Sequence, residues 1–535
     1  TYFTVNTQPY GTKSVFVRDQ TTNQLKTSLF KITPQATITP TQGIVGTSVT
    51  INGNGFGAPE SLAVIFGMTT LAINPVTQNN TGVISANNVF NIDAQPYGDT
   101  PGTVTGGISL YSVNFPGTGF TILANLWYVQ PASGTVGTMI SVSGDGFSKS
   151  STVNIKFGGT SNIVQPYANG YGTWTTSFTI NTQPYGTTTI TGIQSGYDMA
   201  AKTITILPAI VNVNPSSGPV GLTVTVSGNG YPANNNLKIG FGQHTSIAYT
   251  TSDASTGSFT VSFSINTQPA GTTTITVWDS GGTIFAASTF KIGGRLTRIS
   301  PNTGSVGTVV TLEGDGFGSP DGLRVDFGDA SGYNVRSLNI TGGTFTTTFT
   351  VNTQGFGTTT ITVTGIPSNA TAQSIFTITP NIINVIPLLG TVGSGVTVSG
   401  NGFASLEEIS LQFGDMTGIV TGSATATGSF TLQFTVNTQG YGTTGITVKS
   451  ISDQTRYAAT STYRIMPRII EFTPITGTVG CLVTISGNGY GASSTVNIML
   501  GTTLRRSTPA SSGGSFTTTF TIDTQGYGPT TVIAT

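Results

Sequence analysis

The sequence predicts an all-β protein, a tandem array of small β-sandwiches forming an extended rod. Three observations predict this fold. A six-residue motif, Asn-Thr-Gln-x-aromatic-Gly, first occurs at residues 6–11 and returns about every 86 residues along the 535-residue chain. Segments of alternating polar and apolar residues flank the copies. Turn residues separate these segments every 8 to 12 residues or so, a spacing typical of all-β sandwiches.

The Asn-Thr-Gln motif is predicted to connect two strands, because alternating segments such as 345–351 and 359–363 lie on either side of it. We expect its Asn or Asp to bond its own backbone two residues on, and its glycine to adopt a positive φ. We expect its aromatic residue to cap the core, with a ligand-stacking platform as the alternative; Ala270 replaces the aromatic in one copy. The copies begin at Asn6, Asp93, Asn181, Asn266, Asn352, Asn437 and Asp523.

A second block lies between successive copies of the motif. It reads Pro-x-x-Gly-x-Val-Gly, then an alternating segment, then Gly-Asn-Gly or Gly-Asp-Gly followed by Phe or Tyr. The Asn-Gly step predicts a tight turn between strands, and the aromatic residue is expected to close one end of the core. No helix and no Lys-Ser/Thr pair follows, which argues against a phosphate-binding loop. The block spans residues 40–56, 131–147, 215–231, 301–317, 387–403 and 474–490.

Each block is followed by a strand that ends in Phe-Gly in most copies. In residues 323–327, Leu323, Val325 and Phe327 fall on one face, whereas Arg324 and Asp326 fall on the other. This alternation is typical of a half-buried antiparallel strand. No segment longer than a turn or two shows a helical period. About seven short strands per repeat predict an immunoglobulin-like sandwich.

The order of these motifs resembles the IPT/TIG family of immunoglobulin-like domains across all six complete repeats. The Asn-Thr-Gln connection lies outside the family pattern. The resemblance implies modules of surface receptors, adhesins, polysaccharide enzymes or transcription factors, so it specifies the fold more closely than the function. The predicted units are a partial unit at 1–33 and Ig-like units at 34–123, 124–207, 208–293, 294–379, 380–466 and 467–535.

The linkers between units are short, and several contain proline, which predicts stiff junctions. Gly293-Gly294 breaks this pattern and is the expected bend; the junction near Ala124 also lacks proline. Unit 34–123 is the most divergent, with an insertion-like stretch at 68–88 and Pro-Gly-Thr-Gly at 116–119.

Charge is scarce in this chain. Charged residues make up 7% of the sequence and the formal net charge is +0. A surface with so little charge resists self-association poorly, which favours a protein that contacts copies of itself. There is no basic run for nucleic acid and no apolar run of about 18 residues for a transmembrane segment. One cysteine allows no intrachain disulfide, and the composition favours the cell surface of a bacterium or archaeon.

The residues that could carry chemistry do not form a catalytic set. His244 is the one histidine and is expected in a loop, and Cys481 occupies a position held by Thr, Leu or Ser in other repeats. The carboxylate pairs for glycoside hydrolysis would be Glu407 with Glu408, and Asp326 with Asp329, and neither pair recurs between repeats. The chain is therefore predicted not to be an enzyme and to use no cofactor.

Calcium is a weak alternative, because junctions of such arrays can bind it, but the junctions here are poor in acid and Glu471 is the clearest candidate ligand. No metal site is predicted. Three sequons could accept glycan, at Asn79, Asn339 and Asn369, although such triplets also arise by chance in a Thr-rich chain.

The leading hypothesis for function is a structural cell-surface protein that assembles into an extracellular filament, sheath or surface layer. The alternative is an adhesin stalk or carbohydrate-binding array that presents a binding domain outside this chain. The sequence opens on the last strands of a unit and closes on a unit without its final strand. It is expected either to be a section of a longer chain or to join other copies by strand donation.

Overall fold

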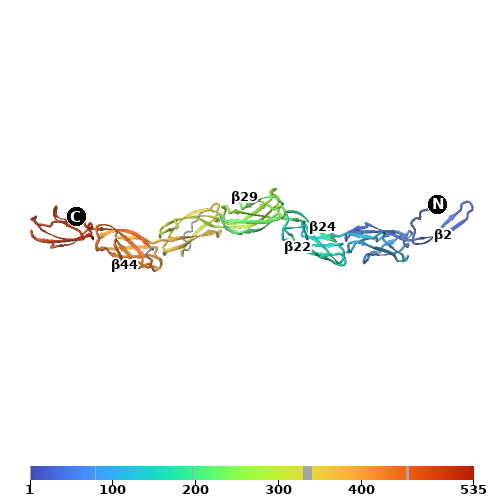
Figure 1. Cartoon of the computed structure of the whole chain (residues 1–535), viewed down its shortest axis with the longest axis horizontal. Coiled ribbons are helices and arrows are strands. Elements are labelled where there is room, and N and C mark those ends of the chain that lie inside the picture. Colours follow the sequence, from blue (N-terminus) through green and yellow to red (C-terminus); the bar gives the residue numbers. More distant parts are fainter. Residues whose placement is uncertain (1, 79, 196, 329–339, 454–456) are drawn as a thin grey trace. The chain divides into compact units, whose positions relative to one another are not determined.

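The computed structural model describes residues 2–535 except 79, 196, 329–339 and 454–456. The described residues form strands, turns and loops and contain no helix (Figure 1). The predicted all-β class is confirmed. Among the described residues no helix is long and apolar enough to cross a membrane.

The chain divides into two compact units. The first comprises Thr1–Pro215, Val224–Phe263 and Thr274–Thr289, and the second comprises Ser216–Thr223, Ser264–Thr273 and Phe290–Thr535. For description, the six predicted ranges from 34–123 to 467–535 are called sandwiches 1 to 6. Their limits remain the predicted ones.

Sandwich 2 shows the topology most completely. One sheet has the order β15-β17-β22, and the other has the order β16-β24-β23-β19-β20. The short β16 runs parallel to β24, whereas the other pairs in this sheet are antiparallel. This is an immunoglobulin-like arrangement of two facing sheets. Its strands are β15 (Asn125–Gln130), β16 (Ser133–Gly134), β17 (Met139–Asp145), β18 (Ser151–Thr152), β19 (Asn154–Phe157), β20 (Thr160–Val164), β21 (Tyr167–Ala168), β22 (Trp174–Thr179), β23 (Gly186–Gln194) and β24 (Tyr197–Ile206).

The alternating pattern accounts for the core between the two sheets. Ile140 and Val142 of β17 and Phe157 of β19 are completely buried, together with Ile190 of β23. Because neighbouring residues of a strand face opposite ways, the polar residues between them face outward. The aromatic residue after Gly-Asp-Gly, Phe147, is also completely buried, as its equivalents are in sandwiches 1 and 3 to 5. The prediction that this residue closes the core is confirmed.

Sandwiches 3 and 5 repeat this plan, with sheets β25-β27-β30 and β26-β32-β31-β28-β29 in the former and β40-β42-β45 and β41-β47-β46-β43-β44 in the latter. The strands of sandwich 3 are β25 (Ala209–Asn214), β26 (Ser217–Pro219), β27 (Thr223–Asn229), β28 (Asn236–Phe241), β29 (His244–Thr251), β30 (Phe259–Ser264), β31 (Gly271–Trp278) and β32 (Phe285–Gly293). Those of sandwich 5 are β40 (Asn381–Ile386), β41 (Leu389–Thr391), β42 (Gly395–Asn401), β43 (Glu408–Phe413), β44 (Met416–Ser423), β45 (Phe430–Thr435), β46 (Gly442–Ser450) and β47 (Tyr457–Met466).

Sandwich 4 has the sheets β33-β35-β37 and β34-β39-β38-β36. Along β36, Leu323, Val325 and Phe327 are buried, and Arg324 and Asp326 form an outward ion pair of 2.8 Å, as the alternation predicted. Its strands are β33 (Arg295–Ser300), β34 (Thr303–Gly304), β35 (Val309–Asp315), β36 (Gly322–Phe327), β37 (Phe345–Thr350), β38 (Gly357–Ile366) and β39 (Thr371–Ile378).

Sandwich 1 is the least regular, as its divergent sequence predicted. Two of its long strands are each broken in two, one at Pro101 and the other around residues 115–119. Proline has no N–H for the ladder, which accounts for the first break. The strands are β3 (Gln35–Thr39), β4 (Gln42–Gly43), β5 (Ser48–Asn54), β6 (Leu62–Phe66), β7 (Thr69–Thr70), β8 (Val76–Thr77), β9 (Ile84–Ala86), β10 (Val89–Asn91), β11 (Gly98–Thr100), β12 (Gly102–Gly106), β13 (Ser112–Asn114) and β14 (Phe120–Ile122).

Sandwich 6 has the sheets β48-β49-β52 and β51-β50-β53, and residues 1–33 contain one antiparallel hairpin, β1-β2. Three strands were expected in 1–33, but Phe3–Val5 is not a strand. The equivalent β22 pairs with β17 of its own sandwich, and residues 1–33 offer no such partner. The strands are β1 (Gly11–Arg18), β2 (Leu25–Ile32), β48 (Arg468–Thr473), β49 (Leu482–Asn488), β50 (Thr495–Leu500), β51 (Thr503–Pro509), β52 (Phe516–Thr521) and β53 (Val532–Ala534).

The tight turns predicted at the Asn-Gly and Asp-Gly steps join strands of different sheets, so they are not hairpin turns. The strand before the step, such as β5, and the strand after it, such as β6, belong to different sheets. The second glycine nevertheless has the predicted positive φ, 74° at Gly55 and 66° at Gly146. A Cβ at Gly55 would lie 2.6 Å from the carbonyl oxygen of Thr33 in the preceding linker. Glycine is therefore required both for the backbone conformation and for close contact with the linker.

Candidate functional site

All seven copies of the Asn-Thr-Gln motif share one side-chain hydrogen bond. The glutamine Nε2 donates to the Oδ1 of the Asn or Asp two residues earlier. The prediction that this Asn or Asp bonds its own backbone is therefore corrected: its oxygen accepts from the glutamine side chain instead. The bonds are Gln8 to Asn6 (2.7 Å), Gln95 to Asp93 (3.0 Å), Gln183 to Asn181 (2.6 Å), Gln268 to Asn266 (2.6 Å), Gln354 to Asn352 (2.7 Å), Gln439 to Asn437 (2.8 Å) and Gln525 to Asp523 (3.3 Å).

The same glutamine links the motif to the Phe-Gly strand of its own sandwich. Gln354 Nε2 donates to the Phe327 carbonyl oxygen over 2.7 Å, and Gln439 Nε2 donates to that of Phe413 over 3.1 Å. A Cβ at Gly328, which follows Phe327, would collide with the Gln354 Oε1. The two motifs were recognised separately in the sequence, and the structure shows that they bind each other.

The aromatic residue of the motif does not cap the core, contrary to prediction. The exposed fraction is 47% for Tyr97 and 48% for Tyr441, and neither belongs to a core cluster. What recurs instead is a main-chain bond: the N–H of this residue donates to the carbonyl oxygen of the buried aromatic residue in the next sandwich. The bonds are Tyr10 to Phe56 (2.8 Å), Tyr97 to Phe147 (3.0 Å), Tyr185 to Tyr231 (3.0 Å), Ala270 to Phe317 (2.9 Å), Phe356 to Phe403 (2.9 Å) and Tyr441 to Tyr490 (2.8 Å).

Three of these six junction bonds lie in the first compact unit and three in the second. The bond at Ala270 shows why an alanine is tolerated in this copy, because a backbone N–H needs no particular side chain. The side chain adds contacts that differ between junctions. The Tyr10 and Tyr111 rings lie 5.7 Å apart, and Arg464 donates to the Tyr441 hydroxyl over 2.7 Å.

A glycine in each following sandwich makes room for the junction bond. Gly172, with a φ of 74°, accepts a hydrogen bond of 3.1 Å from the Phe147 N–H, so both polar groups of the Phe147 peptide backbone are used. A Cβ on Gly172 would collide with the Phe147 carbonyl oxygen and approach the Cα of Pro96 in the preceding motif. The sequence analysis missed this signal, a glycine two residues before the Phe- or Trp-led strand in sandwiches 2 to 6 and two residues before Ile84 of β9 in sandwich 1. The equivalents are Gly82, Gly257, Gly343, Gly428 and Gly514.

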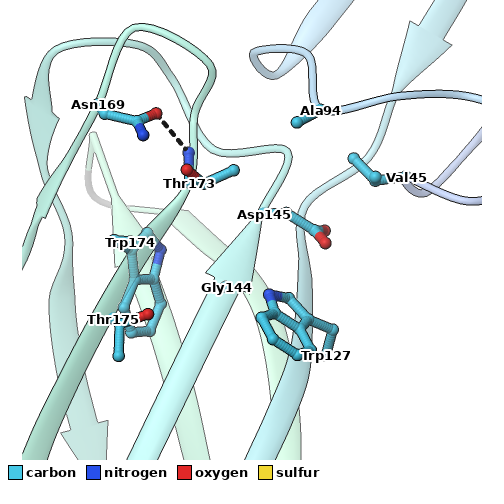
Figure 2. A pocket seen from close by; sticks show the side chains of 9 residues that line it. All are labelled: Val45, Ala94, Trp127, Gly144, Asp145, Asn169, Thr173, Trp174 and Thr175. Carbon is cyan, nitrogen blue, oxygen red and sulfur yellow. Dashed lines mark hydrogen bonds between the residues drawn. The ribbon is translucent and has the colours of Figure 1, made fainter.

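A hollow of about 490 Å3 lies beside the junction of sandwiches 1 and 2, within the first compact unit (Figure 2). Most of its lining comes from sandwich 2. It includes two of the three tryptophans of the chain, Trp127 and Trp174, and one carboxylate, that of Asp145. The lining residues are Val45, Ala94, Trp127, Gly144, Asp145, Asn169, Thr173, Trp174 and Thr175.

Asp145 is the central residue of Gly-Asp-Gly in sandwich 2, and it is buried without a partner. Its exposed fraction is 8%, and its Oδ1 has no hydrogen bond. Burial raises the pKa of the Asp145 carboxyl to about 6, because a charged group loses solvation in this position. The Trp174 Nε1 in the wall is likewise buried without an acceptor.

The equivalent carboxylate in sandwich 4, Asp315, has a partner. Arg295 donates from Nη2 to Asp315 Oδ2 over 2.8 Å and from Nε to Oδ1 over 3.2 Å. This hydrogen-bonded pair raises the pKa of Arg295. In sandwiches 1, 3, 5 and 6 the position holds the neutral Asn54, Asn229, Asn401 or Asn488, so only sandwich 2 has a carboxylate here without an ion pair. The ammonium of Lys202 lies at the Trp127 backbone, where its Nζ donates to the Trp127 carbonyl oxygen over 3.3 Å.

The residues that the sequence analysis considered as catalytic or metal-binding candidates lie at separate places in the structure. His244 is not in a loop, since it begins β29 after a two-residue turn and pairs with Phe241 across that turn. Its side chain is exposed. Cys481 is half-buried, and its Sγ lies 3.7 Å from the Leu482 carbonyl oxygen. Among the described residues, no group of three or more His, Cys, Asp and Glu could hold a metal ion. Glu471 is exposed, and its Oε2 lies 3.5 Å from the Ser486 hydroxyl.

The proposed carboxylate pairs are not brought together. Glu407 is buried and accepts from the Ala404 N–H over 2.8 Å, whereas Glu408 is exposed on β43. Asp326 pairs with Arg324, and Asp329 lies outside the described residues.

Two buried carboxylates that the sequence analysis missed, Glu60 and Asp321, have the same role as Glu407. Both are 3% exposed and accept backbone N–H bonds. Glu60 accepts from Ser109 over 2.8 Å, and Asp321 accepts from Gly318 over 2.7 Å. These carboxylates hold the backbone of loops by hydrogen bonds.

Of the three sequons, one can be placed. Asn369 is exposed in a turn with a φ of 57°. Asn79 and Asn339 lie outside the described residues.

The sheet order and the repeated motifs define a tandem array of immunoglobulin-like sandwiches. Residues 295–379, which correspond to sandwich 4, match the IPT/TIG domain family, so the resemblance drawn from the motifs is confirmed. No curated relative matches the sequence of the chain.

Solved structures resemble the chain in fold. One is a Salmonella alpha-2-macroglobulin mutant, with 10% identity and a TM-score of 0.15 over 97% of this chain and 49% of that one, so the chain spans about half its length. Another is SGBP-B of Bacteroides ovatus with a mixed-linkage heptasaccharide, with 13% identity and a TM-score of 0.18 over 59% and 92%. A third is invasin, a bacterial integrin-binding protein, with 15% identity and a TM-score of 0.17 over 67% and 81%. At these identities the likeness concerns the fold alone.

Proposed function

We propose that the chain is a non-enzymatic structural protein of the cell surface, whose sandwiches form a spacer that assembles with other copies into an extracellular filament, sheath or surface layer. The observation that carries this proposal is the junction bond, which recurs at all six junctions between residues 10 and 490. A main-chain bond that tolerates different side chains suits an array in which each module holds the next in the same way.

Composition supports the second part of the proposal, self-association. With 7% charged residues, like-charge repulsion between copies is weak. Exposed apolar side chains occur throughout the array, for example Met139, Ile383 and Ile470, each more than half exposed. Close approach of two such surfaces is opposed by little electrostatic energy.

The full chain can be tested by small-angle scattering, sedimentation at rising concentration and negative-stain microscopy. We expect a maximum dimension several times that of one sandwich, and ordered polymers at high concentration. A compact particle would contradict the spacer, and a monomer at every concentration would contradict assembly.

A matched pair of variants tests the junction bond itself. Tyr185→Ala keeps the N–H and should leave the scattering curve unchanged, as the natural alanine at position 270 suggests. Gly257→Val places side-chain atoms against the Tyr231 carbonyl oxygen and the Cα of Pro184, so it should loosen that junction and broaden the distribution of dimensions. Hydrogen exchange would check that the sandwich remains folded. Equal scattering by both variants would contradict a role for the bond.

A second candidate function is ligand recognition, as in an adhesin or carbohydrate-binding array. The observation that favours it is the hollow at Asp145, because it interrupts the uniformity of the repeats. Under this proposal sandwich 2 carries a binding site and the other sandwiches are spacers.

A further inference from the structure

The hollow beside Asp145 has the components of a binding site for an organic cation. Asp145 ends β17, and Trp127 lies on the neighbouring β15 where the register of the two strands shifts. Trp127 is 55% exposed, so its ring is available to a ligand, whereas Asp145 is only 8% exposed. Figure 2 shows the carboxylate directed to the Trp127 side of β17 and away from Trp174.

The chain contains its own occupied version of this arrangement. In sandwich 4 the residue paired with Asp315 across the sheet is Arg295, and its guanidinium forms two hydrogen bonds with the carboxylate. In sandwich 2 the residue paired with Asp145 is Asn125, which is short and neutral. The position that holds a cation in one repeat is therefore without one in the other.

We propose that sandwich 2 binds a guanidinium group, as in an arginine side chain of another polypeptide, through Asp145 and Trp127. The planar fork of the guanidinium would form two hydrogen bonds with the Asp145 carboxylate, as Arg295 does with Asp315. Its face would stack on the Trp127 indole, the aromatic side chain that attracts cations most strongly. Val45 and Ala94 supply apolar contacts for the side-chain stem.

Arginine fits this site better than lysine or a sugar. An ammonium is a strongly hydrated point charge that cannot form the paired bonds, and it would lose its water in a half-enclosed hollow. A sugar could stack on Trp127, but it would leave the carboxylate without an opposite charge. Binding should weaken as the pH falls through about 6, because the carboxyl then becomes protonated.

Tryptophan fluorescence of the full chain provides the test. Trp278, the one tryptophan outside the hollow, stacks on Phe285 with ring centroids 4.3 Å apart, so Trp278→Phe leaves the two hollow tryptophans as reporters. In this background the probes are Nα-acetylargininamide, Nα-acetyllysinamide, Nα-acetylglutaminamide and methyl β-glucoside. We expect a saturable change with the arginine probe, and binding of the others at least about tenfold weaker.

Three variants locate the site. Asp145→Asn, which installs the residue found in most other repeats, should weaken binding at least about tenfold. Trp127→Ala should do the same, read by calorimetry. Asn125→Arg supplies an internal cation in the position of Arg295 and should abolish binding; if this variant does not fold, the other two decide. Unsaturable quenching, unchanged affinity in Asp145→Asn, or saturation by the glucoside and not by arginine would each overturn the proposal.

Discussion

Sandwiches 2 and 4 have similar sheets and differ in whether one buried carboxylate has a charged partner. Both have a three-stranded sheet facing a larger one, and both carry Gly-Asp-Gly at the end of the second strand of the smaller sheet. Asp315 in sandwich 4 is held by Arg295, whereas Asp145 in sandwich 2 has an oxygen without a partner. One difference across the strand pair, Asn125 in place of Arg295, thus separates an ion pair from a buried carboxylate without one.

The two sandwiches keep the same backbone plan while one buried position differs in its charge partner. The fold requires the glycines around the carboxylate, and it does not require the carboxylate itself, since other copies have asparagine there. A buried carboxylate without a cation costs stability. Sandwich 2 retains such a group, which is typical of functional sites rather than of structural ones.

The largest loss of stability is expected at a glycine that both sandwiches share. Gly146→Val and Gly316→Val each force a β-branched residue into a φ of 66° or 70° and against the carbonyl oxygen of the preceding linker. Each should destabilise its own sandwich by about 3 kcal/mol, the sum of strain and steric clash. Peptide-resolved hydrogen exchange of the full chain in urea would measure it.

Gly159→Ala is the matched control, because a Cβ at Gly159 meets no atom within 4 Å. It should leave the exchange of sandwich 2 nearly unchanged. Loss of stability in only one of the two valine variants would show that the linker contact is not shared by the two sandwiches.

A smaller effect is expected where sandwich 4 differs from sandwich 2. Arg295→Met leaves Asp315 buried beside no cation, and sandwich 4 should lose about 2 kcal/mol at pH 7; Arg295 is partly exposed, which reduces the loss below that of a fully buried pair. Adding Asp315→Asn should restore most of the stability, because sandwich 5 is built with asparagine there. The same exchange measurement applies.

Arg298→Met is the control for this variant. Arg298 is 61% exposed and pairs with Glu313 over 3.2 Å, so its loss should cost less than about 0.5 kcal/mol. If Arg295→Met and Arg298→Met lower the free energy of unfolding of sandwich 4 equally, the burial of Asp315 does not explain the contribution of Arg295 to stability.

The smallest expected change in stability is a gain rather than a loss, and it concerns sandwich 2. The pKa of Asp145 is about 6 in the fold and about 3.9 in an unfolded chain, so ionisation penalises the folded state as the pH rises through this window. Asp145→Asn should therefore stabilise sandwich 2 by about 1 kcal/mol at pH 7 and have little effect at pH 4, with solvent access to the hollow reducing the gain. Urea denaturation followed by hydrogen exchange at both pH values measures it. Destabilisation at pH 7 would mean that Asp145 has a favourable partner.

Some expectations from the sequence failed for a common reason. The motif aromatic was expected to cap the core, yet Tyr97 and Tyr441 are about half exposed. The pattern that recurs is its backbone N–H, which any residue except proline provides. Similarly, Asn-Gly was expected to make a tight turn between strands, and the sequence did not show that the strands on either side of it enter different sheets. Local turn chemistry specifies φ and not which strands pair.

What the sequence by itself determined is the repeat and the interior of each sandwich. Its period and its alternation of apolar residues predicted the strands, the absence of helices among the described residues and the buried face of segments such as 323–327, because side-chain direction in a strand follows from the chain alone. Only the tertiary structure decided which distant segments meet. The bond from Gln354 to Phe327, the junction from Tyr97 to Phe147 and the missing cation beside Asp145 depend on contacts across sheets and between repeats. No local pattern encodes such contacts, because they arise when separate segments pack.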